Sequence, residues 1–437
     1  MPAPGFAAID FGTSNSAIAL PGDGPDGAPG VALVELEPGF RTMPTAVFYR
    51  ADEPGRYFGR AAIAAYVDGL DGRLMRSMKS VLGSALIEQS TEVGGGQSVK
   101  FTDVIAGYLL HLKRCAEASA GAELRRVVLG RPVFFVDDDP ARDARAQAAL
   151  EAAARSIGFA EVLFQYEPIA AALDHERRVE REQLVLVADI GGGTSDFSLL
   201  RLGPARRGRL DRRDDILANH GVHIAGTDFD RHVELAAVLP LMGYRTLRPS
   251  ARPGDAPREL PSSLYFDLAT WHLINTCYAP ARVAELRRMH GWYADPAHHR
   301  RLLAVLQQRL GHALAAAAEQ AKIDVANLGA GGQALIDLGD VEPGLQAGLA
   351  EPAAAAAIEA DLERIVDAAR QTARLAGVAP AAVDTLYFTG GSTGLQPLVA
   401  RIGAAFAGAS AVRGDRFASV AQGLGVHARA VFGAAAA

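Results

Sequence analysis

Residues 8–16 read Ala-Ile-Asp-Phe-Gly-Thr-Ser-Asn-Ser, and residues 188–197 read Ala-Asp-Ile-Gly-Gly-Gly-Thr-Ser-Asp-Phe. In each stretch an apolar run leads to Asp10 or Asp189, and glycine and small hydroxyl residues precede a second apolar run. This order predicts two β-hairpins, each with an aspartate at the end of its first strand and a tight turn behind it. Glycine and small hydroxyl residues let backbone N–H groups approach phosphate oxygens. The repeated pattern therefore predicts a two-jawed clamp for a polyphosphate, with an aspartate beside each turn to hold a hydrated divalent cation.

Composition restricts the class of protein. The chain has 437 residues, of which 49% are hydrophobic and 22% charged, so we expect a globular chain with room for two lobes. A net charge of −6 argues against non-specific binding of nucleic acid. Cys115 and Cys277 lie far apart and are expected to be free thiols in a reducing compartment. With neither a signal peptide nor a long apolar stretch, we predict a cytoplasmic protein that does not contact a membrane.

Other phosphate and metal motifs are missing from the sequence. It contains no P-loop, no His-Glu-x-x-His and no paired Cys-x-x-Cys, and its one Gly-x-Gly-x-x-Gly match, at residues 22–27, includes a proline and lies in a Gly/Pro/Asp-rich loop. Polyphosphate binding must therefore come from the two hairpins. One Asp-Gly turn alone is most often only a turn, whereas two copies after apolar strands favour function. A further turn, Gly390-Gly391-Ser392-Thr393, follows an apolar strand and suits a nucleoside, although a capped strand-to-helix connection has the same pattern.

The repeated hairpin suggests two lobes related by duplication. We place lobe I at residues 1–182, with an inserted subdomain at about 37–100, and lobe II at residues 183–437, with a mostly helical insertion at about 229–357. Residues 59–85 are predicted to be helical. The basic stretch Arg206–Arg213 is predicted to be an exposed hairpin tip.

Seven stretches, the two hairpins among them, extend the match along nearly the whole chain. The sequence resembles the DnaK-type heat-shock chaperones of the actin-like, sugar-kinase-like ATPase superfamily, and is most similar to the short YegD-type proteins. The stretches that carry the family resemblance are residues 9–15, 78–83, 166–173, 189–196, 226–230, 318–323 and 389–393. Those that carry the closer similarity are residues 130–132, 164–168 and 210–212. The resemblance implies an α/β, two-lobed actin-like ATPase fold, built from duplicated ribonuclease-H-like lobes with inserted subdomains.

The resemblance also implies roles for individual residues, with ATP or ADP and Mg²⁺ as the cofactors. The catalytic residues would be Lys79, Glu167, Asp189, Thr194 and Asp196. The residues around the metal, largely through waters, would be Asp10, Glu167 and Asp189. The nucleotide-binding residues would be Asp10, Gly12, Thr13, Ser14, Gly191, Gly192, Gly193, Thr194, Gly226, Glu319, Lys322, Gly390, Gly391 and Ser392.

Ordinary structural explanations stand beside several of these roles. Lys79 fits a surface lysine on a helix, and Glu167 fits a carboxylate that is favourable at a helix N-terminus. Glu319 and Lys322, three residues apart, fit a helical ion pair worth a few tenths of a kcal/mol, about 0.2–0.5. The order of the motifs favours the functional interpretation in each case.

The sequence departs from the family at several places. Gly394 stands where the family has the arginine that stacks on adenine, and Phe134 replaces an aromatic hydroxyl residue of the first lobe. The insertion around residues 240–305 is longer than that of the family. The resemblance ends with the ATPase part, so we expect no peptide-binding domain.

Together these features predict a slow, Mg²⁺-dependent ATPase that works as a nucleotide-controlled, chaperone-like switch read by a protein partner or client. A small-molecule kinase of the same superfamily is the first alternative, and would show sugar-dependent release of ADP. A nucleotide-binding scaffold with little turnover is the second, and Gly394 is the feature that favours it. A filament-forming actin relative is the third, and light scattering with ATP would detect it.

Overall fold

A computed structural model describes residues 5–23, 29–53, 55–94, 96–136, 139–249, 256, 258–329, 331–415 and 418–433. Contacts divide the chain into two compact units. Unit 1 comprises Met1–Gly221, Ala368–Gly391 and Gly403–Ala437, and unit 2 comprises Val222–Asp367 and Ser392–Ile402. The lobe boundary at residue 182 and the bounds of the two insertions stay predictions.

Among its described residues, unit 1 has two main sheets and two smaller ones, and the first main sheet begins with β1 near the N-terminus. Its strand order is β11-β10-β1-β2-β3, with β4 paired to β2. Strands β1 and β2 are antiparallel, whereas β1–β10 and β10–β11 are parallel. The strands are β1 Gly5–Phe11, β2 Asn15–Asp23, β3 Pro29–Leu33, β4 Thr42–Pro44, β10 Leu124–Arg131 and β11 Glu161–Tyr166.

The second sheet repeats the first. Its order is β14-β13-β12-β17-β18, with an antiparallel β12–β13 hairpin and parallel β12–β17 and β17–β18 pairs. The strands are β12 Gln183–Ile190, β13 Ser195–Leu202, β14 Ile216–Val222, β17 Thr385–Thr389 and β18 Ser410–Arg413. Because β12 takes the place of β1 and β17 that of β10, the duplication predicted from the two hairpins is present. The chain has the α/β, two-lobed actin-like ATPase fold.

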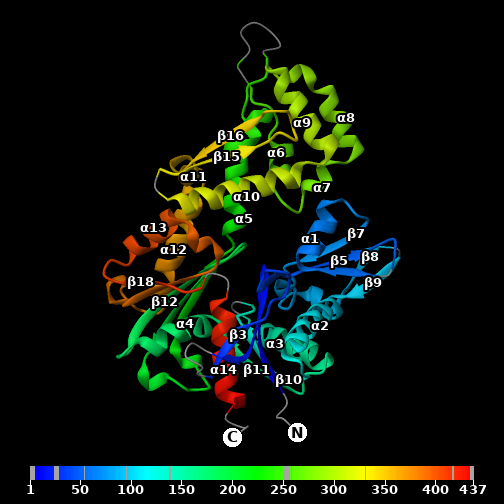
Figure 1. Cartoon of the computed structure of the whole chain (residues 1–437). Coiled ribbons are helices and arrows are strands. Elements are labelled where there is room, and N and C mark those ends of the chain that lie inside the picture. Colours follow the sequence, from blue (N-terminus) through cyan, green and yellow to red (C-terminus); the bar gives the residue numbers. More distant parts are fainter. Residues whose placement is uncertain are drawn as a thin grey trace. The chain divides into compact units, whose positions relative to one another are not determined.

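Helices cover these sheets and place the two hairpins. Helix α4 follows β11 and α14 follows β18, and the two helices pack side by side while α14 also covers β1 (Figure 1). Helix α2 buries an apolar stripe at the helical spacing and ends at Gly121, whose φ of 63° is left-handed. The helices beside these sheets are α2 Phe101–Ala120, α3 Pro140–Ser156, α4 Glu167–Arg178 and α14 Ser419–Gly433, whereas α12 Glu359–Leu375 and α13 Gln396–Ala405 each have residues in both units.

The segment between β4 and α2 corrects one prediction. Residues 59–85 do not form a long helix: a short helix is followed by a strand and then by a 3₁₀ turn at Met78–Val81. Ser77 enters that turn with a left-handed φ of 53°, which breaks the helical spacing of the apolar residues. The elements here are β5 Ala46–Arg50, β6 Arg56–Phe58, α1 Gly59–Val67, β7 Gly72–Arg76, β8 Ser90–Gly94 and β9 Gln97–Lys100.

Unit 2 is mostly helical around its own apolar core, with one two-stranded sheet. Helix α5 leads directly into a π-helical turn at Glu234–Val238, and α10 packs against α5 and that turn. Its elements are α5 Gly226–Val233, α6 Ser263–Leu268, α7 Ile274–Cys277, α8 Pro280–Arg288, α9 Pro296–Gln308, α10 Gly311–Leu328, β15 Gln333–Asp337, β16 Gln346–Ala350 and α11 Glu351–Ala357. Within the described part of the chain, no helix has the length and apolar character needed to cross a membrane.

Candidate functional site

The two hairpins of unit 1 have matching turns. Phe11 pairs with Ser16 and Ile190 pairs with Ser195, so each turn holds four residues, 12–15 and 191–194. Asp10 and Asp189 take the same place, one residue before the last pair of each hairpin. Residues 12–15 and 191–194 are half-buried or exposed, whereas the strands behind them are largely buried. The sheets therefore present two equivalent, accessible turns, each with a carboxylate at its base.

Lys79 and Glu167 meet beside these aspartates. The 3₁₀ turn at Met78–Val81 carries Lys79, and Glu167 is the first residue of α4, where Pro168 favours the start of a helix. The Lys79 ammonium donates to Glu167 Oε1 at 2.5 Å, and only 9% of Lys79 is exposed. A Cβ at position 130 would lie 3.1 Å from the Glu167 carboxylate, so Gly130 leaves space for that side chain. The arrangement places the Lys79 ammonium among acidic groups at the N-terminal end of α4.

Two carboxyl groups of this cluster hold their protons more tightly than exposed aspartates do. Burial, together with Glu167 and Asp189 and against Lys79, raises the pKa of Asp10 to about 8. Burial, together with Asp196 and Glu167 and against Lys79, raises the pKa of Asp189 to about 7. Burial alone would lower the pKa of Lys79, but Glu167 and Asp10 outweigh it and hold that pKa above its ordinary value. The cluster therefore combines one ammonium with buried aspartates whose ionised form is disfavoured.

This donor set fits a hydrated divalent cation. Carboxylate oxygens are the hard ligands that Mg²⁺ takes, and Mg²⁺ usually keeps several of its waters. Among the described residues, no group of three or more His, Cys, Asp or Glu side chains converges closely enough to hold a metal ion directly. Asp10, Glu167 and Asp189 bring carboxyl oxygens near one another, and their contact with a cation through its water shell stays a prediction.

Gly390 packs against the second hairpin. Its φ is +87°, and a Cβ there would lie 2.4 Å from the Ile190 carbonyl oxygen and 2.7 Å from Asp189 Oδ1. Only glycine fits this backbone and this approach. The preceding residue, Thr389, shares a 2.7 Å hydrogen bond with the Ser419 hydroxyl at the start of α14. The third glycine turn therefore begins at the base of the second hairpin, whereas Ser392 belongs to unit 2.

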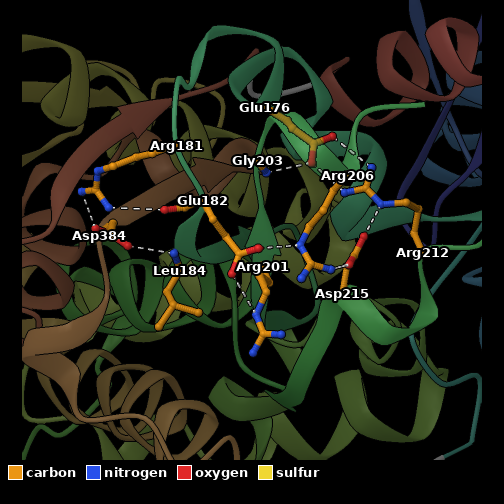
Figure 2. Close-up of polar contacts among 10 residues, drawn as sticks. All are labelled: Glu176, Arg181, Glu182, Leu184, Arg201, Gly203, Arg206, Arg212, Asp215 and Asp384. Atoms are coloured by element: carbon orange, nitrogen blue, oxygen red, sulfur yellow. Dashed lines mark hydrogen bonds and ion pairs between the residues drawn. The ribbon is translucent and has the colours of Figure 1, made fainter. Parts of the chain in front are cut away.

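The C-terminal end of α4 is held by a buried ion-pair network. Arg212 donates twice to the Glu176 carboxylate, at 2.7 and 2.9 Å, and also pairs with Asp215 (Figure 2). Arg206 joins Asp215 to Glu182. Arg212 is 2% exposed and Glu176 is 1% exposed. The prediction that Arg206–Arg213 is an exposed tip is thus wrong for Arg212, because its guanidinium is buried in an ion pair with a carboxylate on α4.

Unit 2 brings together a second group of the predicted residues. Lys322 on α10 lies 3.5 Å from the carbonyl oxygen of Gly226, the first residue of α5, and pairs with Asp230 Oδ1 at 2.5 Å. Glu319 is exposed one turn earlier on α10, close enough to raise the pKa of Asp230. Burial is the main cause of that shift, which takes the pKa of Asp230 to about 6. Asp230, the last residue of the matching stretch 226–230, is not among the residues to which the resemblance gives a role.

The structure thus sorts the predicted residues into two groups. Those of unit 1 gather at the two turns, the Lys79–Glu167 pair and the Gly390 turn. Those of unit 2 are Gly226, Glu319 and Lys322 at the α5–α10 contact, and Ser392. Gly394 ends the 3₁₀ turn at Gly391–Gly394 and carries no side chain with which to stack on a base.

The chain also matches a known protein family. A family model described as Hsp70 protein matches residues 6–237, which is more than half of the chain. The match includes both hairpins, Lys79, Glu167 and α5, and it ends within the π-helical turn that follows α5. It does not distinguish the YegD-type subgroup, which stays a prediction. The chain belongs to the Hsp70 family.

Proposed function

We propose that the chain binds ATP with Mg²⁺, hydrolyses it slowly and changes conformation with the bound nucleotide. Members of the Hsp70 family are ATPases. The observation that carries the proposal is the Lys79–Glu167 pair beside Asp10 and Asp189, at the base of two equivalent glycine turns. Such turns suit phosphate oxygens, and the acidic cluster suits the accompanying cation.

The residues of the chain would act by position and charge. The turns at residues 12–15 and 191–194 offer backbone N–H groups and the hydroxyls of Thr13, Ser14 and Thr194 to phosphate oxygens. Lys79 would stabilise the negative charge that develops on the transferred phosphoryl group. Glu167 holds that ammonium in place and, with Asp196, would orient the attacking water. No covalent step by a side chain is required.

Mg²⁺ would be held near Asp10, Glu167 and Asp189 through its waters. When bound, it supplies positive charge that offsets the phosphate oxygens and this acidic cluster. The residues proposed to bind the nucleoside are Gly390 and Gly391 in unit 1, and Gly226, Glu319, Lys322 and Ser392 in unit 2. With Gly394 in place of a stacking arginine, we expect weaker recognition of adenine than in a chain that carries that arginine.

The switch role is the further part of the proposal. Helix α4 carries Glu167 at its first residue and contacts strands of both main sheets of unit 1. A change in the phosphates next to Glu167 would therefore act directly on an element that joins the two sheets. A cytoplasmic protein partner or client would respond to that change.

Calorimetry with ATP and ADP, each with and without Mg²⁺, tests nucleotide binding. Small-angle scattering of the ATP- and ADP-bound chain tests the switch. We expect binding that Mg²⁺ strengthens and scattering curves that differ between the two nucleotides. Absence of binding would contradict the proposal as a whole, whereas binding with identical curves would contradict only the switch.

A further inference from the structure

Thr45 lies directly behind the first of the two turns. It follows β4, which pairs with the start of β2, and it is 1% exposed. Its hydroxyl donates to the Gly12 carbonyl oxygen at 2.8 Å, and its backbone N–H donates to the Ser14 carbonyl oxygen at 2.9 Å. Two carbonyl groups of this four-residue turn are therefore bound by one residue from another part of the chain.

The hydroxyl of Ser16 completes this arrangement. Ser16 Oγ and Thr45 Oγ1 are 2.9 Å apart, and Ser16 is also 1% exposed. A threonine hydroxyl has one proton, which Thr45 gives to the Gly12 carbonyl, so Ser16 must be the donor to Thr45. The resulting chain runs from Ser16 through Thr45 to Gly12, and it fixes the direction in which the Thr45 hydroxyl points.

The direction of these carbonyl groups decides what the turn can bind. In a planar trans peptide the carbonyl oxygen and the next N–H point in opposite directions. Because the Gly12 and Ser14 carbonyls point at Thr45, the N–H groups of Thr13 and Asn15 point to the other side of the turn. The carbonyl dipoles that would repel an anion are thus bound behind the turn, and N–H groups face its accessible side.

The second turn has a hydrogen bond within itself. Its Gly191 N–H donates to the Thr194 carbonyl oxygen at 3.0 Å. The first turn contains Thr13, Ser14 and Asn15 where the second has Gly192, Gly193 and Thr194. The two turns therefore have the same length and differ in sequence, and Thr45 binds two carbonyl groups of the first.

We infer that Thr45 is a positioning residue that orients the first turn for phosphate binding, an inference that rests on the ATP binding proposed above. Thr45 acts through the peptide groups of residues 12–15 and touches no phosphate itself. Its removal should therefore weaken binding of ligands that carry phosphates and leave binding of a ligand without phosphates unchanged.

The test compares Thr45→Val with Thr45→Ser in the full chain, with ATP and adenosine as the two ligands. Valine keeps the shape and loses the hydroxyl, whereas serine keeps the hydroxyl. We expect Thr45→Val to weaken ATP binding by on the order of tenfold, as for one lost hydrogen bond, and Thr45→Ser to restore it. Adenosine binding should be the same in all three proteins.

Thr372→Val is the matched control. Thr372 is completely buried in α12 and donates its hydroxyl to the Ala368 carbonyl oxygen at 3.0 Å. This variant should lower Tm by a similar amount and leave ATP binding unchanged. If ATP and adenosine binding fall equally in Thr45→Val, or if ATP binding matches that of Thr372→Val, the role of Thr45 is contradicted.

A second variant, Ser16→Ala, tests the same inference if Thr45→Val does not fold. Ser16→Ala removes the donor that orients the Thr45 hydroxyl, and should weaken ATP binding several-fold, less than the loss of Thr45 itself, with adenosine unchanged. Unchanged ATP binding in Ser16→Ala would then overturn the inference. A wild-type chain that binds no ATP would contradict the proposed function first, and the role of Thr45 would fall with it.

Discussion

The Lys79 ammonium lies 2.5 Å from the Glu167 carboxylate, although 88 residues separate them in the sequence. One comes from a 3₁₀ turn and the other from the first residue of α4. Both act on Asp10 and Asp189, whose pKa values are raised by burial and by neighbouring carboxylates. The pair therefore brings the segment between β4 and α2 together with the two duplicated hairpins, in one cluster of ionisable groups.

Lys79→Ala should abolish most ATP turnover. Without the ammonium, the phosphoryl group loses the charge that would stabilise its transition state, at a cost of at least about 100-fold in kcat. Lys100→Ala, at an exposed lysine, is the control and should keep wild-type turnover. Both rates are measured by phosphate release, with ATP binding followed in parallel. Equal turnover in the two variants would remove Lys79 from the proposed mechanism.

Arg212→Met should destabilise the protein strongly. It leaves the carboxylate of Glu176 buried without its partner, and breaking a buried ion pair costs about 3–5 kcal/mol. The free energy of unfolding in urea measures this cost. Arg178→Met, whose pair with Asp174 exposes 74% and 65% of the two side chains, should behave like the wild type.

A double variant separates charge from packing at the same place. Adding Glu176→Leu to Arg212→Met removes the unpaired carboxylate, and Asp215 keeps its partner Arg206. Much of the lost stability should therefore return. A double variant less stable than Arg212→Met alone would show that packing around the guanidinium, and not the stranded charge, causes the loss.

Glu234 should make unit 2 sensitive to pH. It is 1% exposed in the π-helical turn, and its Oε1 has no hydrogen-bond partner among the described residues. Burial, with a contribution from Asp230, raises the pKa of Glu234 well above its ordinary value of 4.5. The folded protein thus keeps a proton that the unfolded chain has already lost. The stabilisation from this proton is complete below pH 4.5 and is lost as pH rises through the folded pKa.

Glu234→Gln tests that dependence. Glutamine keeps the shape of the side chain and cannot ionise, so the variant should match the wild type at about pH 4 and exceed its stability at about pH 8. Glu363→Gln, at an exposed glutamate of α12, should follow the wild type at both values. Urea denaturation gives the comparison. A stability difference between Glu234→Gln and the wild type that does not vary with pH would contradict the prediction.

Gly12→Ala should damage the first turn. A Cβ at position 12 would lie 2.2 Å from the Asn15 carbonyl oxygen, so the turn must change shape to accept it. We expect weaker ATP binding and a lower Tm. Gly403→Ala in α13 meets nothing within 4 Å and should be neutral or stabilising. Unchanged ATP binding in Gly12→Ala would mean that the first turn does not bind the phosphates.

Local sequence patterns were sufficient for the repeated core. Each hairpin combines a buried apolar run, an aspartate and a glycine turn, and these signals depend on neighbouring residues alone. The start of α3 is likewise a local signal, because Asp139 caps the helix by accepting from the Arg142 N–H.

Contacts between distant residues were not predictable in this way. The position of Thr45 behind Gly12, and the pairing of Arg212 with Glu176, depend on how strands and helices pack. The long helix predicted over residues 59–85 does not form, because Gly72 and Ser77 adopt positive φ values that the apolar spacing does not reveal. The ion pair between Asp230 and Lys322 was not predictable, because the sequence offers Lys322 an acidic neighbour, Glu319, on its own helix.

The most direct test of the account is ATP turnover with Mg²⁺ in the wild type, Lys79→Ala and Asp189→Asn, with nucleotide binding measured in the same samples. The account predicts that the wild type hydrolyses ATP and that both variants bind it with little or no turnover. Nucleotide binding without turnover in all three proteins would contradict the ATPase and favour a nucleotide-binding scaffold.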